Sequence, residues 1–200
     1  MLDIIKKRKG LALFSLFLII SVSSYVWWVH FNYRFAAITD GKVFKSGAMP
    51  PQQAAEYAKK YNIKTIIDLR EPKLHDELNP GTQDEIDAEH NAIAKIEGID
   101  HINIASGQIP TKETLQQFFE VLDDPKAYPV WIHCHHGTGR AMLYSALYRI
   151  EYENFSNEDA RSKTRVYVPR SSFAEGRSKG DFLIKYKPRK LGKESTLNSL

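Results

Sequence analysis

The chain opens with a long hydrophobic run and continues with short apolar stretches that alternate with amphipathic ones. Four apolar stretches have the length of buried strands, and they lie at residues 42–45, 64–69, 101–105 and 129–133. Apolar residues at helical spacing predict helices at residues 52–61, 82–97, 112–122, 141–150 and 157–164. Helix caps are predicted at Thr82, which forms a capping box with Glu85, and at Thr111.

Strands that alternate with helices indicate an α/β fold. We expect a single domain with a central, largely parallel sheet of four to five strands flanked by helices, preceded by one transmembrane helix. Roughly 165 residues follow the hydrophobic run, which is enough for one sizeable core.

The only cysteine lies between a predicted strand and a predicted helix. Cys134 precedes Arg140 by six positions, with Gly137 and Gly139 between them. A loop in this place lies at a helix N-terminus, where backbone N–H groups attract anions and lower a cysteine pKa from about 8.5 to roughly 3.5–7.5. The glycines let the backbone curl, and a guanidinium can hold two phosphate oxygens. The pattern predicts a thiolate nucleophile in a phosphate-binding loop.

The sequence from His133 to Arg140 resembles the signature loop of the cysteine-dependent protein tyrosine and dual-specificity phosphatases. The resemblance extends to residues 43–51, 65–70 and 147–150, and it is closest to small bacterial dual-specificity-like phosphatases, some of which are exported. It implies a tyrosine-phosphatase-like fold and hydrolysis of phosphate monoesters through a phosphocysteine, with no metal and no organic cofactor.

The resemblance also implies residue roles. Cys134 would attack phosphorus, and Arg140 would stabilise the equatorial oxygens together with backbone N–H groups. The implied phosphate-binding residues are His135, His136, Gly137, Thr138, Gly139 and Arg140. His133 would support the cysteine region through hydrogen bonds.

Two positions depart from the family pattern. The family has Ser or Thr after the arginine, where the hydroxyl helps the cysteine leave the phosphoenzyme, and this chain has Ala141. The family also has a general-acid aspartate on an upstream loop, and the corresponding residues 104–110 include no carboxylate. General acid catalysis is typically worth about 10²–10⁴-fold, so we expect a slow enzyme or one that acts on good leaving groups.

Several residues could replace the missing acid. Asp68 ends an apolar strand, and ligands of open α/β sheets bind at that edge, but a structural ion pair is the alternative for Asp68. Asp100 starts the next strand, at the opposite end of the sheet. His135 and His136 either donate a proton or face solvent and set specificity.

Cys134 has three alternative interpretations. A zinc site is not predicted, because His133, His135 and His136 crowd into one turn without a second ligand cluster. A catalytically weak or inactive phosphate-binding module is the main alternative. Sulfur transfer by a rhodanese-like domain is the third.

The uncharged run from Leu11 to Val29 is long enough to span a bilayer, and Lys6 to Lys9 precede it. The positive-inside rule then predicts a cytoplasmic N-terminus and a periplasmic or extracytoplasmic catalytic domain. A cleaved signal peptide, with Ser21 to Ser23 as the site, is the alternative. A single cysteine fits an oxidising compartment, since it cannot form an internal disulfide.

Charge is unevenly distributed. Residues 31–160 carry a net charge of −7, and residues 161–193 carry a net charge of +9. The basic region is either a solvated surface or a face that attracts anionic lipids or a polyanionic substrate. Nucleic acid is not an expected partner, because aromatic residues are not interleaved along the tail.

The sequence therefore predicts four segments. They are a cytoplasmic basic segment (residues 1–10), a transmembrane anchor (11–30), a phosphatase-like domain (31–185) and a basic, polar tail (186–200). The predicted protein is a single-pass inner-membrane phosphatase. Its expected substrate is a phosphorylated protein or a small phosphoester, with phosphotyrosine the first choice. The sequence predicts no oligomeric state.

Overall fold

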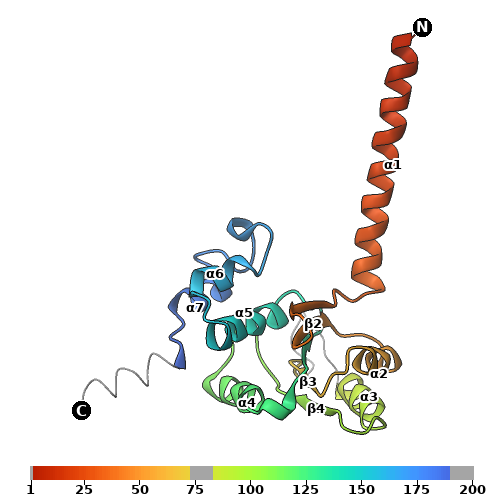
Figure 1. Cartoon of the computed structure of the whole chain (residues 1–200). Coiled ribbons are helices and arrows are strands. Elements are labelled where there is room, and N and C mark those ends of the chain that lie inside the picture. Colours follow the sequence, from red (N-terminus) through yellow and green to blue (C-terminus); the bar gives the residue numbers. More distant parts are fainter. Residues whose placement is uncertain (1, 73–82, 190–200) are drawn as a thin grey trace.

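The computed structural model describes residues 2–72 and 83–189, with side chains from residue 9 onward. A long helix, α1 (Leu2–His30), projects from an α/β domain (Figure 1). The segment Lys9–His30 has a mean hydropathy of 1.9 and is not buried against the domain. By length and composition α1 can cross a membrane or serve as a signal sequence.

A five-stranded sheet forms the centre of the domain, in the order β1-β2-β5-β3-β4. Its strands are β1 (Ala36–Thr39), β2 (Val43–Gly47), β3 (Thr65–Asp68), β4 (Asp100–Asn103) and β5 (Val130–Cys134). Strands β2 to β5 are parallel, whereas β1 pairs with β2 in the antiparallel sense. The predicted α/β fold with a largely parallel sheet is confirmed.

Successive residues of the central strands pack on opposite faces of the sheet. Ile66 and Trp131 pack with α2 (Pro51–Lys60) and α3 (Gln83–Ile93) on one face. Ile67 and Ile132 pack on the other face with α4 (Lys112–Asp123), α5 (Arg140–Tyr152), α6 (Asn157–Ser162) and α7 (Ser178–Lys185). Two short 3₁₀ turns, η1 (Pro125–Ala127) and η2 (Val168–Arg170), complete the described elements. The two layers of helices are visible on either side of the sheet in Figure 1.

Some element boundaries differ from the prediction. Helix α3 ends at Ile93 rather than at residue 97, because the chain turns before Gly98, whose φ is +75°. Helix α4 has the predicted cap, since Thr111 accepts a hydrogen bond from the backbone N–H of Thr114. The predicted cap at Thr82 lies outside the described residues, as do residues 190–200 of the predicted tail.

Candidate active site

The candidate nucleophile lies where β5 ends and α5 is about to begin. Cys134 is the last residue of β5, and Arg140 is the first residue of α5. The Cys134 thiol is 1% exposed, and its Sγ accepts a hydrogen bond from the backbone N–H of Gly137 at 3.3 Å. The loop therefore has the predicted position between a strand and a helix N-terminus, where backbone N–H groups attract anions.

The loop packs directly on the end of β2. Gly137 has a φ of +69°, and a Cβ there would lie 2.3 Å from the backbone N of Gly47. The backbone N–H of Ala48 donates to the carbonyl of His135 at 3.0 Å. Only glycine permits both the positive φ and this close approach. The path of the loop is thus fixed by the strand beside it.

Arg140 is held by the backbone of two neighbouring segments. Its Nη1 donates to the carbonyls of Leu69 at 2.9 Å and Ser106 at 2.8 Å, and the side chain is 1% exposed. Glu71 Oε2 lies 3.8 Å from the same Nη1, and the Glu71 side chain is 39% exposed. Glu71 is therefore a partly exposed carboxylate close to the site, and no sequence pattern had pointed to it.

Three cations hold the outer side of the loop, and no sequence pattern had placed them beside Cys134. Arg34 Nη1 donates to the carbonyl of His136 at 3.0 Å, Lys45 Nζ donates to that of Gly137 at 3.4 Å, and Arg165 donates to that of Thr138. These positive charges favour the binding of an anion such as phosphate.

Lys45 has the most unusual environment of the three. Burial lowers its pKa from 10.5 to about 8; nearby Cys134 opposes this change, and the charges of Arg165 and Arg34 add to it. A lysine in the middle of a strand, with apolar neighbours, was the available sequence signal.

A buried ionic cluster lies behind the loop. Arg70 donates to both carboxylate oxygens of Asp68, at 3.1 Å or less, and to Glu89 Oε2 at 2.7 Å. His133 Nε2 lies 3.0 Å from Glu89 Oε1 and 3.8 Å from Asp68 Oδ1. Burial opposes the charge on His133, but the charges of Glu89 and Asp68 prevail and raise the His133 pKa. Glu89 comes from α3 and was missed by the sequence analysis.

This cluster bears on two predictions. Asp68 has no exposed surface and binds Arg70, which is the ion pair named as the alternative to an acid role. Ligand atoms of Asp68, Glu89, His101 and His133 lie within 4.8 Å of one another, as in metal sites. Arg70 already donates to both carboxylates, so a cation there would have to displace a guanidinium.

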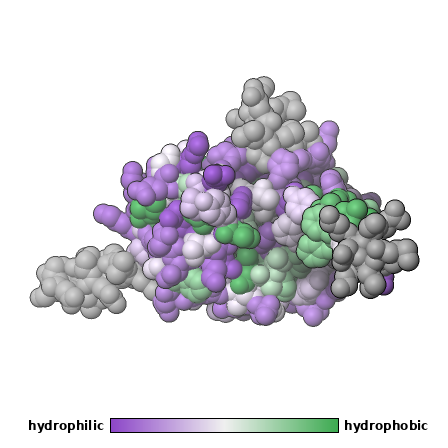
Figure 2. Space-filling model, turned by 90° about the horizontal axis from the view of Figure 1, so that it is seen from above, coloured by the Kyte–Doolittle hydropathy of each residue, from purple (hydrophilic) through white to green (hydrophobic). Residues whose placement is uncertain are grey.

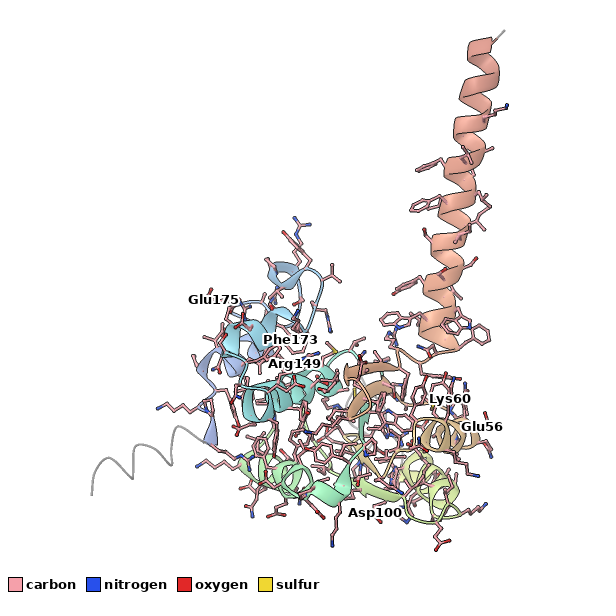
Figure 3. All side chains as sticks on the ribbon, viewed as in Figure 1. Glu56, Lys60, Asp100, Arg149, Phe173 and Glu175 are labelled. Atoms are coloured by element: carbon pink, nitrogen blue, oxygen red, sulfur yellow. The ribbon has the colours of Figure 1, made fainter. Side chains whose placement is uncertain are left out.

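The predicted acid loop, residues 104–110, approaches the candidate phosphate loop with an amide and a lysine. Gln108 Oε1 accepts a hydrogen bond from Lys179 Nζ at 2.6 Å. A Cβ on Gly139 would lie 3.7 Å from Gln108 Oε1 and 3.8 Å from Lys179 Nζ. A cation therefore lies beside the loop near the place where the family has its acid. Asp100 is distant from this edge, at the start of β4 (Figure 3).

The remaining loop side chains differ in exposure. His136 is exposed, whereas His135 and Thr138 are half-buried. His135 lines a hollow of about 470 Å³ together with Met49, Pro50 and Pro51. Ala141 is fully buried in the first turn of α5.

Comparison with known sequences finds one family. The family model described as "DSP-PTPase phosphatase fused to NAD+ Kinase" matches residues 34–178. A probable NAD kinase 2, chloroplastic, from Oryza sativa subsp. japonica is 29% identical over 99 residues. That match covers 48% of this chain and 9% of the relative, so it concerns one segment of a much longer protein.

Solved structures share the fold. The core catalytic domain of the PP-IP phosphatase SIW14 from S. cerevisiae has a TM-score of 0.56 at 16% identity, over 82% of this chain and 92% of that one. A putative phosphatase from Shewanella putrefaciens CN-32 has a TM-score of 0.54 at 22% identity, over 75% and 87% of the two chains. At these identities the likeness establishes a common tyrosine-phosphatase-like fold.

Proposed function

The chain belongs to the family of DSP-PTPase phosphatases fused to NAD+ kinase and has a tyrosine/dual-specificity-type phosphatase domain, and from this premise we propose a specific activity. The protein is a membrane-anchored phosphatase that hydrolyses phosphate monoesters, phosphotyrosine first, through a phosphocysteine on Cys134. The single observation that carries the proposal is the Cys134 loop, with Gly137 N–H on the sulfur and Arg140 fixed next to it.

The proposed chemistry has two steps. The Cys134 thiolate attacks phosphorus, the S–P bond forms, and the bond from phosphorus to the leaving oxygen breaks. Water then attacks phosphorus, which releases inorganic phosphate and restores the thiolate. Arg140 and the backbone N–H groups of residues 135–140 stabilise the equatorial oxygens in both steps. Arg34, Lys45 and Arg165 act indirectly, by holding the loop.

The leaving oxygen needs a proton or a positive charge. Three groups are candidates: Glu71, which lies 3.8 Å from Arg140 Nη1, Lys179, which lies beside Gly139, and Asp68, which is buried in the ionic cluster. Asp68 remains the acid proposed from the sequence. Its bonds to Arg70 disfavour that role, because the guanidinium donates to both carboxylate oxygens and the side chain has no exposed surface. Without a dedicated acid, good leaving groups such as phenols are favoured.

A phosphotyrosine substrate has support from the surface beside the loop. The hollow next to His135 is lined by the apolar side chains Met49, Pro50 and Pro51 and by the charged residues Arg70, Asp84 and Glu85. An aromatic ring could pack there while its phosphate enters the loop. Lipid phosphates and inositol phosphates are other members of the phosphoester class.

Membrane anchoring rests on α1. The helix is exposed and apolar, and Tyr25, Trp27 and Trp28 lie in its last turns, as in an interfacial aromatic belt. The proposed topology has residues 1–10 in the cytoplasm and residues 31–185 outside. An alkaline-phosphatase fusion after Leu200 should then be active and a cytoplasmic reporter silent. The opposite pattern would contradict the topology.

The activity is tested with the full chain in detergent. Wild type and Cys134→Ser are assayed with an aryl phosphate across pH, and vanadate binding is measured in parallel. Turnover that disappears in Cys134→Ser is the expected result. If both proteins are inert and both bind vanadate, the chain is instead a phosphate-binding module, the function favoured by Ala141 and by the absence of a carboxylate in residues 104–110.

A further inference from the structure

An exposed apolar tip lies between α6 and α7. Among the described residues C-terminal to Phe31, the large hydrophobic side chains that are exposed are Val166, Tyr167 and Ile184. Val166 is completely exposed, at 108%, and Tyr167 is 61% exposed. Val166 and Tyr167 are adjacent in the chain, so two large apolar side chains are exposed to water at one tip.

The tip is surrounded by positive charge. From Arg161 to Lys179 the chain has six Lys or Arg residues and one acidic residue, Glu175. Lys163 and Arg170, on either side of the tip, are exposed. Apolar side chains between basic ones are typical of segments that enter the headgroup region of an anionic bilayer.

The tip and α1 project from the same side of the domain. Figure 1 shows that the segment between α6 and α7 rises in the direction of α1, past the end of α1 that joins the domain. Seen from that side, the face beside α1 is mainly hydrophilic with isolated hydrophobic groups (Figure 2). A bilayer spanned by α1 would therefore meet the tip.

The backbone of this segment is well supported from below. The Arg165 guanidinium lies 5.1 Å from the centre of the Phe173 ring, and Phe173 is fully buried. Arg161 Nη1 donates to the Phe173 carbonyl at 2.9 Å, and the hydroxyl of Ser171 donates to that of Val168 at 2.9 Å. These contacts fix both ends of the segment to the domain, so that Val166 and Tyr167 remain on the surface.

We propose that residues 163–170 form a second membrane contact, in which Val166 and Tyr167 enter the interface of an anionic bilayer and Lys163 and Arg170 bind lipid phosphates. The proposal rests on the proposed anchoring by α1. A soluble polyanion would explain the charges, but it would leave Val166 and Tyr167 in water, so the bilayer accounts for more of the surface.

The contact has a consequence for the site. Arg34, four residues after the end of α1, donates to the carbonyl of His136 in the candidate catalytic loop, and Arg165, next to Val166, donates to that of Thr138. Arg34 thus links the α1 anchor to the catalytic loop, and Arg165 links the second membrane contact to the same loop. The site then opens close to the lipid headgroups, where phosphoesters at the membrane surface are concentrated.

Spin labels test the contact in the full chain. On a Cys134→Ser background, single cysteines replace Val166, Phe17 in α1, or Asp100 at the far edge of the sheet. The labelled proteins are reconstituted into vesicles containing phosphatidylglycerol, and collision rates with oxygen and with a water-soluble nickel chelate are compared. Circular dichroism of each variant checks the fold.

The outcomes separate the two proposals. We expect oxygen collisions to exceed nickel collisions at Phe17→Cys and Val166→Cys but not at Asp100→Cys, with the Val166→Cys protection reduced in neutral vesicles. Protection at Phe17→Cys with Val166→Cys as accessible as Asp100→Cys would overturn the second contact and leave the anchor intact. Accessible Phe17→Cys would overturn the anchor and, with it, the contact. If the label at Val166→Cys is accessible to nickel and Lys163→Gln raises the KM for a soluble substrate, the segment binds substrate and the membrane contact is overturned.

Discussion

The Glu89 carboxylate is predicted to hold the buried side of the site together. Glu89→Gln keeps the shape of the side chain and removes its charge, which faces His133 at 3.0 Å and Arg70 at 2.7 Å. Breaking a buried ion pair from one side costs about 3–5 kcal/mol. Since a glutamine oxygen can still accept from Arg70 and His133 can lose its proton, we expect the lower end, about 3 kcal/mol.

The loss should depend on pH. Burial acts to lower the His133 pKa, but Glu89 and Asp68 raise it above 6.5, so the folded state holds this proton more tightly than the unfolded state. The resulting stabilisation is complete below the unfolded pKa of 6.5 and is lost as pH rises through the folded pKa. The destabilisation by Glu89→Gln is therefore expected to be larger at pH 6 than at pH 9.

Urea unfolding measures this effect through tryptophan fluorescence, in which the buried Trp131 reports on the core and the exposed Trp27 and Trp28 give a background. Glu85→Gln is the matched control, because Glu85 lies on the same helix, 3.9 Å from Arg70 Nη1, with half of its side chain exposed. An exposed pair contributes about 0–1 kcal/mol. The reasoning is refuted if the two variants unfold at the same urea concentration, or if Glu89→Gln costs more at pH 9 than at pH 6.

Three further predictions concern the loop. Gly137→Ala should lower vanadate affinity and turnover by at least about tenfold, since the added Cβ would collide with the backbone of Gly47. Gly41→Ala is the control, because Gly41 also has a positive φ, +67°, but has open space around it. It should change the stability by about 1 kcal/mol and leave the activity intact. Gln108→Asp should raise kcat for substrates with poor leaving groups by up to about 10²-fold and add a basic limb to the pH profile of kcat. An unchanged pH profile would argue against position 108 as the place of the general acid. Vanadate affinity should fall as pH rises through about 8, where Lys45 loses its charge, and Lys45→Gln should bind more weakly with a flatter profile between pH 7 and 9.

Local patterns in the sequence predicted most of the fold. The four parallel strands and the helices around them follow from apolar runs and helical periodicity, which depend on near neighbours. Strand β1 was not predicted, because Ala36–Thr39 is short and is stabilised by pairing with β2. Helix α7 was not predicted either, because residues 178–185 lie in the basic region, whose charge obscured the helical period.

The site was predictable only where it is contiguous. Cys134, the glycines and Arg140 lie within one stretch, so their spacing identified the loop. Glu89 and Arg34 reach the site from α3 and from the segment behind α1, and the Arg34–His136 contact joins residues 102 positions apart. Such contacts arise from packing of the whole domain, and no local pattern encodes them.

The central claim is that Cys134 forms a phosphocysteine, and rapid acid quench with mass spectrometry tests it most directly. The full chain is mixed with an aryl phosphate and digested, and the peptide containing Cys134 is examined. Because Ala141 lacks the hydroxyl that assists breakdown of the intermediate, the adduct of one phosphoryl group should accumulate, and Ala141→Ser should reduce it. Turnover without any adduct on Cys134, persisting in Cys134→Ser, would contradict the account.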